Sequence, residues 1–112
     1  MSTLKTNTIK NTDDVEMYLA KAWVNFNSIS TLYIIGAGNV SSVTDISVGN
    51  YQVNYTNPLP STNYAVLTSC FSHIYDQDTA YTDRLTTSTI VKATNGNGSF
   101  MDANSFSVAI FV

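Results

Sequence analysis

Residues 73–84 concentrate the side chains of this sequence that are best suited to recognise another molecule. The only histidine, His73, and the only arginine, Arg84, stand at the two ends of this segment. Two tyrosines and three aspartates lie between them: Tyr75, Asp76, Asp78, Tyr81 and Asp83. Tyrosine rings stack on sugar faces, and carboxylate and guanidinium groups hydrogen-bond hydroxyls, so a glycan is the ligand class we expect for such a contact loop. The alternative is an ordinary solvated loop that joins two strands.

Metal and cofactor sites have weak support. Asp76-Gln77-Asp78 resembles the start of a calcium loop, but the turn glycine and the terminal glutamate are absent, so we expect no metal. The single cysteine, Cys70, excludes an intramolecular disulfide and a four-thiolate zinc site, and its apolar surroundings indicate a buried, inert thiol. Residues 36–38 (GAG) lack a third glycine and run into β-branched residues, so we interpret them as a turn and expect no cofactor.

The sequence offers few residues that could act in catalysis. The chain has one histidine, one glutamate (Glu16) and no Gly-x-Ser-x-Gly pattern. An aspartate pair is conceivable, but no spacing singles one out among Asp45, Asp76, Asp78, Asp83 and Asp102. We therefore expect no enzyme, and a small glycan hydrolase is the remote alternative. We interpret the glycosylation-type triplets at Asn39, Asn54 and Asn97 as chance matches in a chain rich in Asn and Thr.

Composition favours a β-rich domain. The 112 residues are 44% apolar but only 12% charged, and Ser, Thr and Asn supply 40 of them. Such residues solvate strand faces, whereas helices usually expose Lys, Glu and Arg. A net charge of −3 with five Lys plus Arg argues against a nucleic-acid partner. No segment has the length of a membrane span or the pattern of a signal peptide, so we expect a protein made in a cytosol and not inserted in a membrane.

Hydrophobic periodicity predicts seven strands and a short N-terminal arm. The strands are expected at residues 20–27, 32–35, 40–46, 51–55, 64–73, 85–92 and 106–112. Residues 11–19 have helical features that would make at most two turns. The prediction is an all-β fold, a small antiparallel β-sandwich or jelly-roll-like domain at residues 20–112 with an extended arm at residues 1–19. The side chains expected to face inward are Val24, Phe26, Val53, Tyr55, Val66, Val108 and Ile110.

Three stretches together resemble a known family. Residues 20–27 (AKAWVNFN), 39–45 (NVSSVTD) and 49–56 (GNYQVNYT) resemble, in this order, a module found at the C-terminal ends of tailed-bacteriophage tail fibre proteins. In those fibres the module ends a long protein, whereas here it takes up nearly the whole chain. The resemblance weakens between about residues 71 and 104.

This resemblance implies a virion structural protein without enzymatic activity. It implies a tail-fibre or appendage subunit that contacts the host surface, a homotrimer that binds other virion proteins; a capsid decoration protein (cement or head fibre) is the alternative. Trp23 falls on the polar side of its predicted strand, so either both faces of that strand are covered or the indole packs against a neighbouring subunit; with the resemblance, we expect Trp23 at a subunit interface. We expect Leu4 and Ile9 in the arm to contribute to that interface, and residues 73–84 to face the host.

Overall fold

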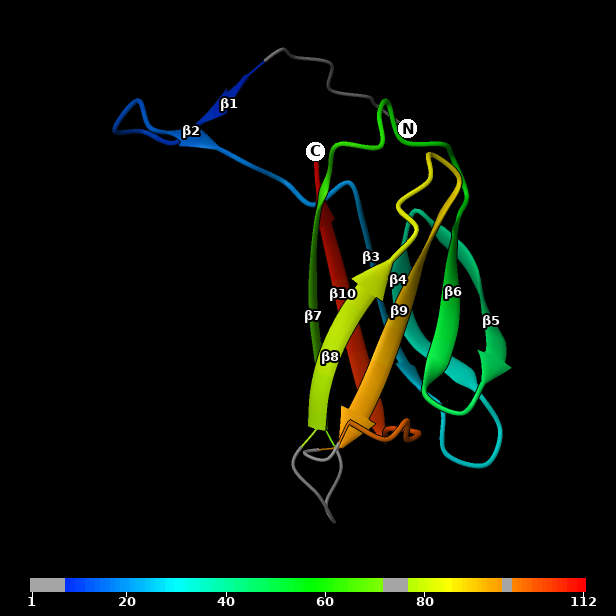
Figure 1. The fold of residues 1–112 in the computed structure, drawn as a ribbon. Coiled ribbons are helices and arrows are strands. Elements are labelled where there is room, and N and C mark those ends of the chain that lie inside the picture. Colours follow the sequence, from blue (N-terminus) through cyan, green and yellow to red (C-terminus); the bar gives the residue numbers. More distant parts are fainter. Residues whose placement is uncertain (1–7, 72–76, 96–97) are drawn as a thin grey trace.

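Strands with a residue period of two form two antiparallel sheets in the computed structural model, which describes residues 8–71, 77–95 and 98–112 (Figure 1). The first sheet has the strand order β4-β3-β10-β7, and the second has the order β5-β6-β9-β8. The first sheet consists of β4 (Tyr33–Gly38), β3 (Ala22–Asn27), β10 (Ser105–Phe111) and β7 (Ala65–Phe71). The second consists of β5 (Val40–Ser47), β6 (Asn50–Tyr55), β9 (Ser88–Asn95) and β8 (Gln77–Thr82). The predicted all-β sandwich is confirmed.

Alternation along the strands places one set of side chains in the core between the sheets. β6 and β10 each alternate buried and half-buried residues over their whole length. Six of the seven predicted inward side chains are buried, and the seventh, Val66, is partly buried and packs against the core. The period of two therefore identified the inner face correctly.

Three aromatic rings from both sheets meet at the centre of this core. Phe26 of β3 stacks on Phe106 of β10, with ring centroids 5.3 Å apart. Tyr51 of β6 meets both edge-on, at 5.1 Å from Phe26 and 5.9 Å from Phe106. Edge-to-face and offset pairs of this kind add about 0.5–1.5 kcal/mol each beyond their buried area.

The hydroxyl of Tyr51 reaches through this core into a polar network. It donates to the carboxylate of Asp102 at 2.6 Å and lies 2.5 Å from the hydroxyl of Ser28. The Ser28 hydroxyl also accepts a hydrogen bond from the backbone N–H of Ala103 at 2.9 Å. Asp102 accepts a second bond from the Gly49 N–H at 3.2 Å. The network thus fixes the segment that enters β10 against the ends of β3 and β6.

The short crossing from β4 to β5 depends on Asn39. Its backbone has a positive φ of 54°, which asparagine tolerates better than most residues. Its side-chain amide donates to the carbonyls of Lys21 (3.1 Å) and Asn57 (3.2 Å), and its side-chain carbonyl accepts from the N–H of Asn57 (2.8 Å). This asparagine therefore joins the entry to β3 with the exit from β6.

Three sequence-based predictions differ from the structure. Residues 77–82, expected in a loop, form strand β8, because they pair with β9 from Gln77↔Asn95 to Thr82↔Ile90. The glycines at positions 36 and 38 lie within β4 and not in a turn. Residues 11–19, expected to be helical, contain no helix; Glu16–Met17 form β2, which pairs with β1 (Ile9–Lys10).

The physical reason for the hairpin lies in Asn11. Its side-chain oxygen accepts hydrogen bonds from the N–H groups of Asp13 (2.9 Å) and Val15 (3.1 Å), which is the local bonding by which asparagine favours turns over helices. Asp14 adopts a positive φ of 64°, and the N–H of Asn11 bonds the carbonyl of Val15 at 3.0 Å. A two-turn helix had no comparable support.

Buried tyrosines make the fold sensitive to alkaline pH. Burial first, and then the hydrogen bond to Asp102, raise the pKa of Tyr51 far above its ordinary value of 10.0, and burial raises the pKa of Tyr55 in the same direction. Above pH of about 10 the unfolded chain loses phenolic protons that the folded chain keeps, so stability must fall as pH rises. In this pH range each buried phenol lowers the free energy of unfolding by about 1.4 kcal/mol per pH unit. Urea denaturation at a series of pH values should show Tyr51→Phe with a slope shallower by that amount.

The matched control is Tyr33→Phe, since Tyr33 is exposed on β4. An unchanged alkaline slope in Tyr51→Phe would contradict the assignment.

The contribution of the Asn39 side chain to stability can be tested by a substitution that keeps its shape but changes its hydrogen-bonding groups. Asn39→Asp keeps the acceptor for Asn57 but replaces the amide donor with an oxygen that faces two backbone carbonyls. We expect a loss of about 1–3 kcal/mol in the free energy of unfolding by urea titration. Asn54→Asp is the control, because the amide of Asn54 bonds the hydroxyls of Ser42 (3.1 Å) and Thr44 (3.0 Å), which can turn and donate to a carboxylate. Equal losses in the two variants would contradict this account.

Candidate functional site

The outer face of the first sheet is built around Trp23. Because Val24 and Phe26 face the core, the indole of Trp23 points outward, and 46% of its surface is exposed. The indole lies across the neighbouring strand β4, where a Cβ atom on Gly38 would collide with its pyrrole ring and one on Gly36 would lie 3.2 Å from its Cη2 atom. The two glycines therefore form the seat of the indole, which the sequence pattern did not reveal.

A shallow trough of about 530 Å³ lies beside the indole. Trp23 pairs across strands with Ala109 of β10, and Ala109 pairs with Leu67 of β7. Small side chains at positions 107 and 109 form the floor, and the side chain of Leu67, 54% exposed, forms the far wall. The trough is therefore an apolar hollow across three strands.

No Asp, Glu, Lys or Arg occurs in β3, β4, β7 or β10, as the structure bounds these strands. The second sheet differs, with Asp45 in β5 and Lys92 in β9. Three polar side chains of the first sheet's outer face bond one another: the side-chain oxygen of Asn25 accepts from the hydroxyls of Ser105 (2.9 Å) and Ser107 (3.4 Å). Lack of charge and the presence of an aromatic residue are typical of the centre of a protein interface.

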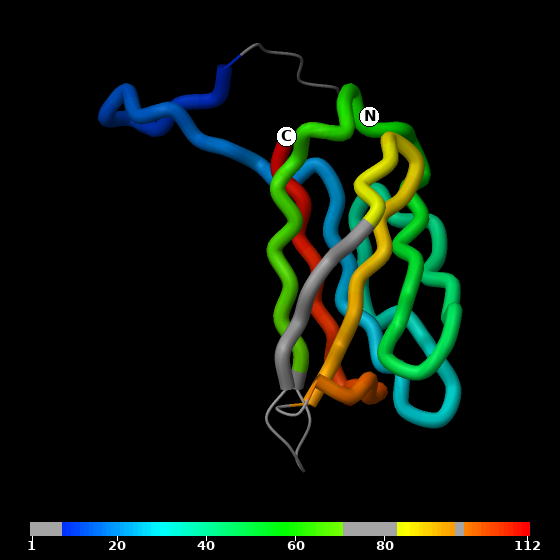
Figure 2. Tube along the Cα trace, in the orientation of Figure 1, coloured from blue at the N-terminus to red at the C-terminus, as the bar shows by residue number. Residues whose placement is uncertain are grey.

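The arm is the second exposed apolar feature. Figures 1 and 2 show that the β1–β2 hairpin stands away from the sandwich on a connecting segment that leads into β3. Its large apolar side chains are uncovered, with exposed fractions of 57% for Val15, 49% for Met17, 77% for Tyr18 and 58% for Leu19. Ile9, predicted at an interface, is half-buried in β1, and Leu4 lies outside the described residues. A hollow of about 580 Å³ separates the hairpin from Phe111 and Val112 at the end of the chain.

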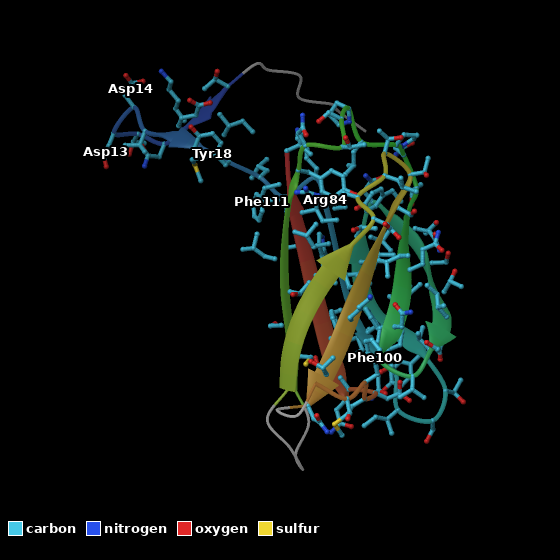
Figure 3. All side chains as sticks on the ribbon, in the orientation of Figure 1. Asp13, Asp14, Tyr18, Arg84, Phe100 and Phe111 are labelled. Carbon is cyan, nitrogen blue, oxygen red and sulfur yellow. The ribbon has the colours of Figure 1, made fainter. Side chains whose placement is uncertain are left out.

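The predicted contact loop is divided by β8. His73, Tyr75 and Asp76 lie outside the described residues, Asp78 and Tyr81 lie in β8, and Asp83 and Arg84 follow that strand. A six-residue strand is about 20 Å long, so residues before and after β8 are attached to opposite ends of it. Figure 3 shows Arg84 at the same end of the sandwich as Phe111. The expectation of a single loop is therefore wrong.

Arg84 has a structural contact. Its guanidinium Nη1 donates to the backbone carbonyl of Tyr64 at 3.1 Å. The hydroxyl of Tyr64 in turn lies 2.8 Å from the carbonyl of Leu85 and 3.1 Å from that of Ser88. These contacts tie the β8–β9 connection to the start of β7.

Within residues 8–71, 77–95 and 98–112, no group of three or more His, Cys, Asp or Glu side chains is placed to hold a metal ion. This part of the chain also contains no helix that is long and apolar enough to cross a membrane. Comparison with protein-family models, with curated proteins and with solved structures gave no match. The trough and the arm are the two exposed apolar surfaces that we consider as candidate binding sites.

The seat of the indole gives a direct test. Gly38→Ala places a methyl group where the pyrrole ring lies, so we expect it to displace Trp23 and to change its emission spectrum and quenching by acrylamide. Gly36→Ala is the matched control, because its Cβ meets only the far edge of the ring at 3.2 Å and needs a small adjustment. Trp23 is the single tryptophan, so the signal is unambiguous. Identical spectra for wild type and Gly38→Ala would contradict the described placement.

Proposed function

We propose that this chain is a structural subunit of a bacteriophage virion, a tail-fibre or appendage module without enzymatic activity that self-associates as a homotrimer. The observation that carries the proposal is the arm, whose four apolar side chains from Val15 to Leu19 remain in water in a single chain. Exposed apolar groups gathered in this way mark interaction sites. The resemblance of residues 20–27, 39–45 and 49–56 to the tail-fibre module supports the same function.

The sandwich suits such a role because it presents a stable scaffold with two separate contact surfaces. The outer face of the first sheet carries Trp23, and the arm reaches away from the sandwich (Figure 1). A subunit with one surface for its neighbours and one for the particle can be built into a larger assembly. Contact of residues 73–84 with a host glycan stays a prediction.

The arm can be tested in infected cells. Replacing Val15, Met17 and Leu19 together by serine should leave the sandwich folded, since the hairpin is remote from the core, and should prevent incorporation into particles. Immunoblots of purified virions measure incorporation, and circular dichroism with a thermal transition measures folding. The control is the pair Lys10→Ser and Asp14→Ser, which removes the 3.2 Å ion pair of the hairpin and leaves its apolar residues intact. Normal incorporation of the triple variant would show that the arm is dispensable.

The position on the particle separates the proposal from its alternative. Antibody against the protein, imaged on intact virions by electron microscopy, should label the tail or an appendage. Labelling spread over the capsid would identify a decoration protein instead, and absence from purified virions would refute both functions.

A further inference from the structure

We propose that the arm of one copy covers the outer face of the first sheet of a second copy, with Val15, Met17 and Leu19 seated on the trough between Trp23 and Leu67. This inference rests on the proposed self-association and identifies the two surfaces that would meet. The segment that would occupy the trough is the arm of another copy of this chain.

The chemistry of the trough selects an uncharged, apolar occupant. Its walls are Trp23 and Leu67, and Ala109 lies between them in the same cross-strand row. Because the four strands of this sheet contain no charged residue, an acidic or basic partner would lose hydration on this face without finding a counter-charge. An apolar strand has no charged groups that would lose hydration on this face.

Two serine hydroxyls beside the trough are already paired. Both Ser105 and Ser107 direct their hydroxyls to the side-chain oxygen of Asn25, so these groups already have partners within the face. Covering them leaves no new buried donor unpaired on these hydroxyls.

The arm presents the matching surface. Glu16 and Met17 form β2, so their side chains point to opposite sides. In the docked arm that we propose, this alternation continues over residues 15–19 and places residues 15, 17 and 19 on one side. Val15, Met17 and Leu19 therefore form an apolar row, and Glu16 falls on the opposite side. This row is about 14 Å long at the strand rise of about 3.4 Å per residue, and the three strands of the trough span about 10 Å at a spacing of about 4.8 Å, so the row is long enough to cross the trough.

In the single chain the arm leaves the end of the sandwich where Phe111 and the C-terminus lie (Figures 1 and 3). Met17 and Leu19 line a hollow together with Phe111, whereas the described residues that line the trough come from β3, β7 and β10 alone. The apolar row stays 49–58% exposed in the single chain. A contact from the arm of one copy to the face of the next is heterologous, and such contacts repeat until a ring closes. Each copy then offers one arm and has one face covered, which fits the proposed trimer.

The single tryptophan reports directly on the covered face. At a concentration where light scattering finds the oligomer, emission of Trp23 should shift to the blue, and its acrylamide quenching should fall several-fold relative to dilute protein. The triple variant Val15→Ser, Met17→Ser and Leu19→Ser should show neither change, whereas the control pair Lys10→Ser and Asp14→Ser should behave as wild type. An oligomer in which Trp23 remains fully quenchable would overturn the inference.

Crosslinking identifies what covers the face. In a Cys70→Ala background, one protein carries Met17→Cys and a second carries Ala109→Cys. A short bismaleimide should crosslink an equimolar mixture of the two and neither protein alone.

Crosslinks within Ala109→Cys alone would mean that two sheet faces pack together, and crosslinks within Met17→Cys alone would mean that arms pair; either result refutes the arm-to-face contact. An oligomer that gives no crosslink refutes it as well. If light scattering finds a monomer at every concentration, the proposed self-association itself fails. Protection of Trp23 that requires another purified virion protein would assign the face to that protein and overturn the inference.

Discussion

The contact among Phe26, Phe106 and Tyr51 is the constraint on which the rest of the structure depends. It joins the two sheets through rings less than 6 Å apart, and the Tyr51 hydroxyl extends the contact to Ser28 and Asp102. A phenol serves better here than a phenylalanine because its ring fills the core while its hydroxyl bonds the segment that leads into β10. Once Phe26 is fixed inward, the pleat of β3 forces Trp23 and Asn25 to the outside.

The packing of the core therefore decides which residues of the first sheet face outward, but it does not decide which residue types stand at those positions. Outward positions of a strand are free to carry charge, as Lys92 does in the second sheet. The first sheet instead carries an exposed indole and two glycines in β4, although glycine inside a strand costs about 0.5–1 kcal/mol relative to alanine. Packing of the indole over these glycines protects the edge strand β4 within one chain, and a partner would cover the 46% of the indole surface that stays exposed.

The arm also exposes apolar side chains that one chain does not cover. Local hydrogen bonds of Asn11 close the turn of the hairpin, but Val15, Met17 and Leu19 stay about half exposed in one chain. A short hairpin is marginally stable by itself. The hairpin and the sheet face are thus two incomplete surfaces of one molecule, and mutual burial would complete both.

The sequence by itself determined the all-β class, the inward side chains and most strand positions, because strand periodicity is local and is encoded residue by residue. It missed β8, whose polar residues become a strand only by pairing with β9. It also missed the roles of Gly36 and Gly38, because their purpose is set by an indole that lies thirteen or more positions earlier in the chain and beside them in space. Only the tertiary structure decided which segments share a sheet, that residues 73–84 do not form one loop, and that Trp23 lies against Gly36 and Gly38. Pairing between segments that are distant in the chain has no local sequence signature, so it becomes visible only in the tertiary structure.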